Sequence, residues 1–207
     1  KMQSINVAGS VVETRSFDEK KFNEESALSI KYFLKSYLGG SQGDIDDTKF
    51  LAEIQKLNKA LASESGKVLS HRDLHSRNIM VCDGDYNLID FQDARMGLPY
   101  YDLVSLLEDC YFPLSSKKRS HLIDYYRKNS PLMEKVSQEN FNKFYEMSAI
   151  QRIFKALGSF SFINETRKDD RYLKYVGVGV HRLLEILSSH SDFNNFYKIL
   201  KRSYHDN

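Results

Sequence analysis

The amino-acid sequence predicts a mostly α-helical chain with one small β-hairpin near its middle. Apolar residues recur three and four residues apart through most of the 207 residues, which is the spacing of one helix face. An Asp-Gly-Asp turn signal at residues 83–85 separates two short apolar runs, at 79–81 and 86–89, as in a tight hairpin. With 41% hydrophobic and 28% charged residues, a chain of this length can bury a core of its own.

Two helices are expected before the hairpin. Residues 16–19, Ser-Phe-Asp-Glu, form a capping-box pattern that predicts the start of the first helix, and Gly39-Gly40 predicts its end. Residues 46–48, Asp-Asp-Thr, predict the start of the second helix, and Gly66 predicts its end. A short apolar stretch at Val68-Leu69 follows and leads into a polar segment before the hairpin.

After Pro99 the helical spacing returns and continues to the end of the chain. Gly158 lies within the longest of these runs, where it is expected to break or kink the helix. The expected helical segments are residues 101–112, 117–128, 138–167, 171–189 and 193–204.

Composition and charge exclude several classes of partner. Thirty basic and twenty-eight acidic residues leave a net charge of +2, which does not indicate a nucleic-acid partner. No apolar run reaches the roughly 18–20 residues of a membrane span, so no membrane partner is expected. Cys82 and Cys110 form neither a disulfide framework nor a zinc motif; Cys82 is expected to be a buried free thiol, and the protein is expected to be cytoplasmic. Neither composition nor charge indicates an oligomeric state.

The polar segment before the hairpin concentrates reactive residue types. It reads His71-Arg72-Asp73-Leu74-His75-Ser76-Arg77-Asn78, and Asp90-Phe91 follows the hairpin. Phosphoryl transfer needs a carboxylate that accepts the proton of the attacking hydroxyl, and oxygen ligands that hold Mg²⁺ against the phosphates. Asp73 can provide the first function, and Asn78 with Asp90 can provide the second.

The hairpin gives this assignment a geometric reason. Asn78 begins the first strand and Asp90 follows the second, and antiparallel pairing brings those two ends together. Asn78 and Asp90 are therefore expected to face one cation, with Asp73 in the preceding loop. The segment also matches the H-R-D-L-x-x-x-N signature of protein kinases, whereas Asp90-Phe91-Gln92 departs from their D-F-G.

These motifs resemble those of the aminoglycoside-phosphotransferase and choline-kinase branch of the protein-kinase-like fold. That branch combines H-x-D-x-x-x-x-N, a hairpin, I-D-F/W and a Y-D-L-A-like helix start, which here is Tyr101-Asp102-Leu103-Val104. Residues 89–97 and 101–107 are similar to a bacterial subgroup whose members include kinases of the anomeric hydroxyl of N-acetylmuramate or N-acetylglucosamine. The resemblance extends from about residue 17 to about residue 190.

The resemblance implies an ATP- and Mg²⁺-dependent transfer of a phosphoryl group to a hydroxyl of a small molecule, an amino sugar by the subgroup match. Asp73 is then the catalytic base, and Asn78 and Asp90 are the Mg²⁺ ligands.

Three further residues are expected to support the loop by structure alone. His71 braces the loop against Phe91, and Arg72 forms an ion pair. Asp102 is expected to cap a helix and to bond back to the catalytic loop.

Candidate contacts to the acceptor or the phosphates follow from the same resemblance. For Gln151, Arg152 and Lys155, which share one helix turn, the alternative is a solvated or ion-paired helix face. The candidates are Arg77, Gln92, Asp93, Arg95, Gln151, Arg152 and Lys155.

A complete kinase-like enzyme also has a nucleotide lobe, with a Gly-rich loop, a strand lysine and a helix glutamate. None of these patterns is found, since the only G-x-G, at Gly177 and Gly179, lies inside a helical run. The chain is therefore expected to be the helical C-terminal lobe of a kinase-like phosphotransferase without its N-terminal nucleotide lobe, and to be inactive alone. Residues 1–15 are expected to be a remnant of the inter-lobe linker, and residues 16–207 the lobe, with the catalytic loop and hairpin at 68–95.

Two other functions stay open. One is an aminoglycoside or choline-like kinase, and the other is a non-catalytic, kinase-like binding module. Arg77, Arg95, Arg152 and Lys155 favour a neutral or anionic sugar over a polycationic aminoglycoside. Choline would call for an aromatic cage.

Overall fold

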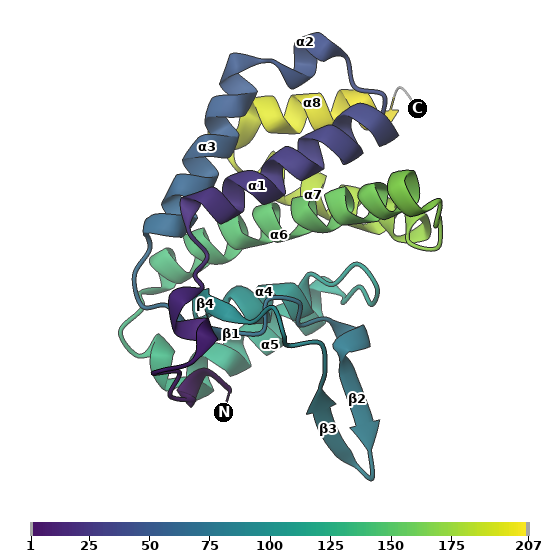
Figure 1. Cartoon of the computed structure of the whole chain (residues 1–207). Coiled ribbons are helices and arrows are strands. Elements are labelled where there is room, and N and C mark those ends of the chain that lie inside the picture. The colour runs from purple at the N-terminus through teal and green to yellow at the C-terminus, as the bar shows by residue number, and fades with distance from the viewer. Residues whose placement is uncertain (1, 206–207) are drawn as a thin grey trace. The chain divides into compact units, whose positions relative to one another are not determined.

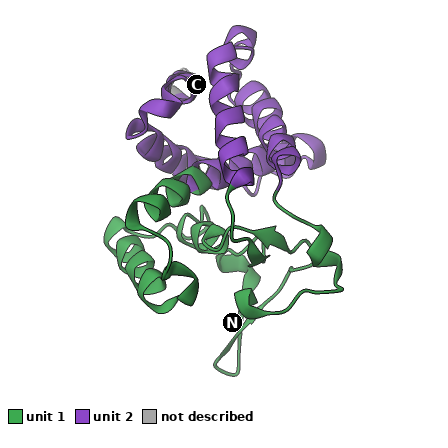
Figure 2. Ribbon diagram, turned by 90° about the vertical axis from the view of Figure 1, so that its left-hand side faces the viewer, with its two compact units in different colours: residues 1–17, 64–148 green, residues 18–63, 149–207 purple. Residues whose placement is uncertain are grey.

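A computed structural model describes residues 2–205, and most of them are helical (Figure 1). The predicted fold class, mostly α with small β elements, is confirmed. The chain divides into two compact units, one of residues 1–17 and 64–148 (unit 1) and one of residues 18–63 and 149–207 (unit 2) (Figure 2). The division falls inside the longest helix, α6 (Gln138–Arg167). Lys1, with which the expected linker remnant begins, lies outside the described residues.

Unit 1 contains two antiparallel strand pairs. The expected hairpin is formed by β2 (Ile79–Cys82) and β3 (Asp85–Leu88), with Ile79 opposite Leu88. Asp83 and Gly84 between them have φ angles of 52° and 85°, as a two-residue turn with left-handed backbone requires. The second pair joins β1 (Val68–Ser70) to β4 (Arg95–Gly97), a strand that the sequence pattern did not predict.

Close backbone approach explains why β4 ends in glycine. A Cβ on Gly97 would lie 2.7 Å from Ser70 Oγ and 2.9 Å from the Phe17 ring. The Phe17 ring in turn packs on Tyr101, with 4.3 Å between the ring centroids. Glycine at this position therefore lets the β1–β4 pair sit directly on the buried aromatic core of unit 1.

The helices of unit 1 are α4 (Tyr101–Leu107), α5 (Ser116–Asn129) and the first part of α6. Helix α4 is shorter than the predicted segment 101–112. Asp109 Oδ1 accepts a hydrogen bond from the Tyr111 amide at 2.8 Å, and such a local turn competes with helix continuation.

Unit 2 is a helical assembly around a cluster of phenylalanines. Phe196 packs on Phe154 and Phe50, at ring-centroid distances of 4.9 and 5.4 Å. Its helices are α1 (Glu19–Ser29), α2 (Gln42–Ile45), α3 (Thr48–Ser63), the second part of α6, α7 (Val176–Ser188) and α8 (Asn194–His205).

Helix α1 begins two residues later than the capping-box pattern predicts. Ser16 pairs with Met96 in an isolated β-bridge, so its side chain is not at the helix start. Asp18 is the cap instead, and its Oδ1 accepts a hydrogen bond from the Lys21 amide at 2.7 Å. The chain continues as a π-helix, Ile30–Tyr37, in which the Leu38 amide reaches back five residues to Phe33 O.

The predicted start of α3 is confirmed, because Asp47 Oδ1 accepts a hydrogen bond from the Phe50 amide at 2.7 Å. The predicted break at Gly158 is wrong, since α6 runs through it for 30 residues. A Cβ on Gly158 would lie 2.3 Å from Ser29 Oγ, so this glycine permits close packing of α1 on α6.

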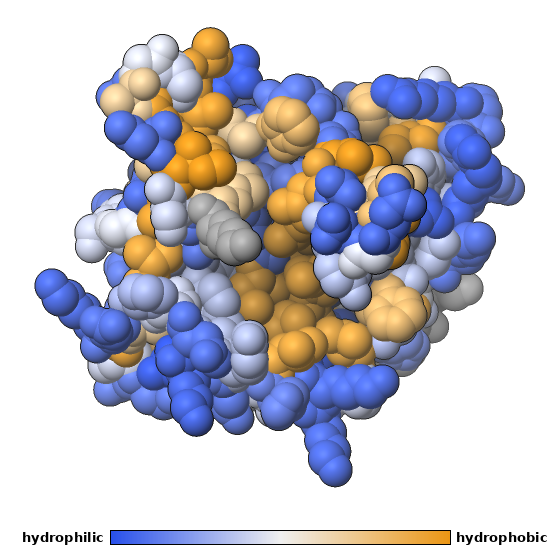
Figure 3. Space-filling view, turned by 90° about the horizontal axis from the view of Figure 1, so that it is seen from below, coloured by the Kyte–Doolittle hydropathy of each residue, from blue (hydrophilic) through white to orange (hydrophobic). Residues whose placement is uncertain are grey.

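The prediction that Cys82 is buried is wrong. Cys82 is exposed, not buried, because a two-stranded hairpin buries neither of its faces by itself. Large apolar side chains are exposed along the same hairpin, among them Val81 at 66% and Tyr86 at 78%. Hydrophobic side chains also reach the surface on the face shown in Figure 3.

Within residues 2–205, no helix is both long and apolar enough to cross a lipid bilayer.

The remaining short helical turns are 3₁₀ in geometry. They include residues 11–14, although Val11 and Val12 are β-branched residues of the kind that favours strands. Their bounds are Met2–Ser4, Val11–Thr14, Ser76–Asn78, Pro131–Met133, Leu173–Tyr175 and Ser191–Phe193.

Candidate active site

The predicted catalytic loop, residues 71–78, joins β1 to β2 within unit 1. His71 is buried, and its Nε2 lies 2.9 Å from Ile89 O on the far side of the hairpin. The ring therefore joins the first residue of the loop to the residue before Asp90. Phe91, against which the sequence suggested that His71 braces the loop, is 64% exposed.

Asp102 holds the beginning of the loop through backbone amides. Its Oδ2 accepts a hydrogen bond from His71 N at 2.7 Å, and its Oδ1 accepts one from Arg72 N at 3.1 Å. Asp102 is the second residue of α4, and Tyr100 occupies the cap position without a side-chain cap bond. The expected bond back to the loop is thus present, but Asp102 is not the cap residue.

Asn78 ends the 3₁₀ turn Ser76–Asn78 and is buried. Its Nδ2 donates to Asp73 O at 2.9 Å, so its Oδ1 is the side-chain atom that remains for a cation. Asn78 O accepts a hydrogen bond from Ile89 N at 3.1 Å, which extends the hairpin by one pair beyond Ile79 and Leu88. Asn78 and Asp90 consequently lie at the same end of the hairpin.

Asp90 has left-handed backbone, with a φ of 66°. Its Oδ1 accepts a hydrogen bond from Gln92 Nε2 at 2.6 Å. Gln92 O in turn accepts one from Arg15 Nη1 at 3.1 Å. Gln92, a candidate acceptor contact, is therefore engaged with the proposed metal ligand.

The donor set at this end of the hairpin fits Mg²⁺. The ion is hard and prefers oxygen, and proteins hold it through one or two side chains, with phosphates and water completing the shell. Asn78 Oδ1 and the Asp90 carboxylate are such ligands. In the part of the chain that the structure describes, no three His, Cys, Asp or Glu side chains form a cluster that would hold a metal.

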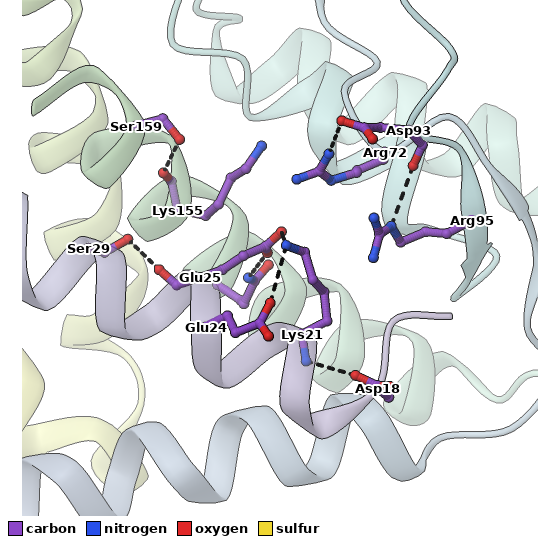
Figure 4. Close-up of polar contacts among 11 residues, drawn as sticks. Asp18, Lys21, Glu24, Glu25, Ser29, Arg72, Asp93, Arg95, Lys155 and Ser159 are labelled. Atoms are coloured by element: carbon purple, nitrogen blue, oxygen red, sulfur yellow. Dashed lines mark hydrogen bonds and ion pairs between the residues drawn. The ribbon is translucent and has the colours of Figure 1, made fainter. Parts of the chain in front are cut away.

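Arg72 forms an ion pair with Asp93, another candidate acceptor contact. Arg72 Nη1 lies 2.6 Å from Asp93 Oδ2, as the dashed line in Figure 4 marks. Asp93 O also accepts a hydrogen bond from Arg95 Nε at 3.4 Å, and the Arg95 guanidinium lies 5.2 Å from the Phe17 ring centroid. The segment after Asp90 is thus tied both to the loop and to the core of unit 1.

Arg77, the remaining unit 1 candidate, lies with its guanidinium 4.2 Å from the Tyr111 ring centroid. Two residues before Tyr111 in the chain, Asp109 accepts a hydrogen bond from Ser76 N at 2.8 Å. The sequence prediction missed Asp109 because the segment 101–112 was expected to be continuous helix. The sequence did offer a signal for Asp109, which is an Asp two residues before an aromatic residue, near the end of a short apolar helix.

Gln151, Arg152 and Lys155 lie on α6 within unit 2. Gln151 is 2% exposed, and its Nε2 donates to Glu25 Oε2 at 2.9 Å. Lys21 Nζ lies 3.7 Å from Glu25 Oε1 (Figure 4). Arg152 is also buried, so the solvated-face alternative does not hold for Gln151 and Arg152.

A mostly helical fold with a His-Arg-Asp loop, a hairpin and a following Asp-Phe pair defines a kinase-like phosphotransferase. The model of the phosphotransferase enzyme family matches residues 17–137, more than half of the chain. The chain therefore belongs to this family, and the resemblance predicted from the sequence is confirmed.

Curated relatives are consistent with this family. The chain is 29% identical to the N-acetylmuramate/N-acetylglucosamine kinase of Neisseria meningitidis serogroup B, over 65% of this chain and 41% of that protein. It is 27% identical to the kinase of the same name from Pseudomonas aeruginosa, over 83% of this chain and 50% of that protein. A third relative of that name, from Pseudomonas putida, is 28% identical over 76% and 47%. The chain thus spans about half the length of the curated relatives it matches.

Proposed function

We propose that the protein transfers a phosphoryl group from ATP, with Mg²⁺, to a hydroxyl of an amino sugar of the N-acetylglucosamine or N-acetylmuramate type. The observation that carries the proposal is the shared hairpin end of Asn78 and Asp90, with Asp73 bonded to Asn78 in the adjoining loop. This arrangement supports one site for a metal and a base. The names of the relatives support the class of acceptor.

In the proposed mechanism, Asp73 orients the acceptor hydroxyl and takes its proton as the oxygen attacks the γ-phosphorus. The bond from the γ-phosphorus to the β,γ-bridging oxygen breaks, and ADP leaves with that bond's electron pair. Asn78 Oδ1 and the Asp90 carboxylate would hold Mg²⁺, and the bound ion would supply charge neutralisation to the phosphates. Asn78 Nδ2 fixes the backbone of Asp73. Much of the rate enhancement in such a reaction comes from positioning, so these contacts bear directly on turnover.

The acceptor class rests on charge as well as on the relatives. Among the four candidate contacts in unit 1, Arg77 and Arg95 are cationic and Asp93 alone is acidic. Cations repel a polycationic aminoglycoside and tolerate a neutral or anionic sugar. Gln92, Asp93 and Gln151 are each bonded to another side chain, and their contact with the acceptor stays a prediction.

The test is an ATP-consumption assay on the longest form of the protein that its gene encodes. The acceptors are N-acetylglucosamine, N-acetylmuramate, an aminoglycoside and choline. Asp73→Asn is expected to lower kcat by about 10²–10⁴-fold, the usual contribution of a general base. Asp83→Asn, at the exposed hairpin turn, is the matched control and is expected to leave turnover within about twofold, because Asn also tolerates left-handed backbone.

Each outcome has a definite meaning. Turnover that survives Asp73→Asn would rule out the proposed base. Faster phosphorylation of the aminoglycoside or choline than of either sugar would overturn the acceptor class. No ATP consumption with any acceptor, together with sugar binding, would favour the non-catalytic binding module.

A further inference from the structure

Two buried carboxylates bind the two ends of the catalytic loop in unit 1. Asp102, at the start of α4, binds the amides of His71 and Arg72. Asp109, just after the end of α4, binds the amide of Ser76 at 2.8 Å. Asp109 is 7% exposed, and it lies outside the H-x-D-x-x-x-x-N pattern of residues 71–78.

The Ser76 amide is the first donor of the 3₁₀ turn Ser76–Asn78. The first amides of a helical turn have no partner within the turn, so they need an acceptor from elsewhere. The turn closes where Asn78 N donates to His75 O at 2.9 Å. A carboxylate on Ser76 N therefore fixes the turn that ends in Asn78.

Asp109 uses its second oxygen on a different segment. Its Oδ1 accepts a hydrogen bond from Tyr111 N at 2.8 Å, which orients the residue whose ring packs against the loop. The Tyr111 ring lies edge-on to His75, with 5.0 Å between centroids, and lies under the guanidinium of Arg77. One carboxylate thus ties the loop both by a direct bond and through an aromatic contact.

We propose that Asp109 is a positioning residue for the metal ligand Asn78 and, through Asn78, for Asp73. The path runs from Asp109 Oδ2 to Ser76 N, along the turn to Asn78, and from Asn78 Nδ2 to Asp73 O. The inference rests on the proposed function, since it assigns Asn78 to Mg²⁺. Asp109 itself contacts neither metal nor substrate in this assignment.

The chemistry of the side chain makes the role specific to a carboxylate. Both oxygens of Asp109 accept from backbone amides of separate segments. The amide of an asparagine has one accepting oxygen, and its NH₂ group would face the other N–H. Asp109→Asn therefore keeps the size of the side chain and breaks one of the two bonds.

The first experiment compares Asp109→Asn with Asp124→Asn in the full-length protein. Asp124 is an exposed acid of α5 and is the matched control. The measurements are kcat, the KM for the sugar, the Mg²⁺ concentration for half-maximal activity, and Mn²⁺ affinity by electron paramagnetic resonance with a non-hydrolysable ATP analogue. Loss of a group that orients a metal ligand typically weakens metal affinity about 10–100-fold.

The expected result for Asp109→Asn is a rise of about 10-fold or more in both metal constants and a fall in kcat, with the sugar KM within about twofold. A merely structural role would not separate metal affinity from sugar KM in the folded enzyme. Asp124→Asn is expected to change none of these quantities by more than about twofold.

A second variant covers the case in which Asp109→Asn does not fold. Ser76→Pro removes the N–H that Asp109 accepts, and proline is compatible with the first position of a helical turn after an extended residue such as His75. Ser76→Pro is expected to weaken Mn²⁺ binding in the same direction. In the double variant, the two effects are expected not to add, because both substitutions act on the same bond, between Asp109 and the Ser76 amide.

Unchanged Mn²⁺ affinity in either folded variant of an active parent would overturn the role of Asp109. So would a double variant whose effects add in full. An inactive parent that binds neither Mn²⁺ nor the analogue would instead overturn the proposed function, and the inference with it.

Discussion

Two residues beside the candidate site have backbone that L-amino acids rarely adopt. Arg72 and Asp90 have φ angles of 78° and 66°, and such conformations cost roughly 1–2 kcal/mol each. Asp102 bonds to the Arg72 amide, and Gln92 bonds to the Asp90 side chain. Strain that is held by specific bonds occurs on both sides of the hairpin end at which the metal is proposed. This is the pattern expected of a preorganised site.

Tyr100 gives a residue-scale prediction about pH. Burial, together with the nearby charge of Glu64, raises the pKa of Tyr100 well above its ordinary value of 10.0. As the pH rises, the unfolded chain therefore loses this proton first. Above about pH 10 the folded state binds more protons than the unfolded state. The stabilising contribution is complete below that pH and is lost above it, at about 1.4 kcal/mol per pH unit.

We expect Tyr100→Phe to make the alkaline decrease in the free energy of unfolding shallower by about 1.4 kcal/mol per pH unit. Near pH 7 the change is expected to be neutral or stabilising, because the Tyr100 hydroxyl is buried without a hydrogen-bond partner among the described residues. Urea unfolding from pH 7 to 11 measures the effect. Tyr86→Phe, at an exposed position, is the control. An equal decrease for parent and Tyr100→Phe would contradict the prediction.

At the scale of elements, local patterns predicted what local chemistry determines. The hairpin, the start of α3 and the extent of α6 follow from turn residues, a cap and periodicity, which act within a few residues. The start of α1 did not follow, because Ser16 is bonded to Met96, eighty residues away. The end of α4 did not follow either, because Asp109 turns the chain toward the loop.

Two helix glycines provide an element-scale prediction with an internal control. Gly158→Ala removes the helix penalty of glycine, worth about 1 kcal/mol, but places a Cβ 2.3 Å from Ser29 Oγ and 2.6 Å from Ser29 Cα. Backbone cannot yield cheaply, so overpacking is expected to lower the free energy of unfolding by about 1–3 kcal/mol. In α7, a Cβ on Gly177 would meet only Tyr204 Oη at 3.5 Å.

Gly177→Ala is therefore expected to stabilise the protein by up to about 1 kcal/mol. Urea denaturation of the two variants and the parent measures both effects. Stabilisation by Gly158→Ala would show that α1 and α6 do not pack as closely as the structure indicates.

At the scale of the whole molecule, the sequence predicted the composition of the candidate site better than the organisation of the fold. Asp73, Asn78 and Asp90 belong to one short stretch, so spacing and a hairpin were enough to group them. The division into two units was not predicted, because each unit combines segments that are far apart in the chain. Contacts such as that of Glu25 with Gln151 depend on helix packing, which no local pattern encodes.

The division into units predicts unequal local stability. Phe196 is fully buried against Phe50 and Phe154 in unit 2, and Phe196→Ala is expected to cost about 3–5 kcal/mol. Because each unit has its own core, amide exchange is expected to accelerate by about 100-fold or more in unit 2. The α4 and β1–β4 peptides of unit 1 are expected to keep the protection of the parent.

Hydrogen exchange followed by mass spectrometry measures this difference peptide by peptide. Phe112→Ala, at an exposed position of unit 1, is the control and is expected to change neither unit. Helix α6 provides the critical peptides, because its first part packs in unit 1 through Phe141 and Tyr145 and its second part packs in unit 2 through Phe154. Protection should therefore change along this one helix, near residues 148 and 149. Equal acceleration along its whole length would show that the two cores unfold together and that the loop of unit 1 depends on unit 2 for its stability.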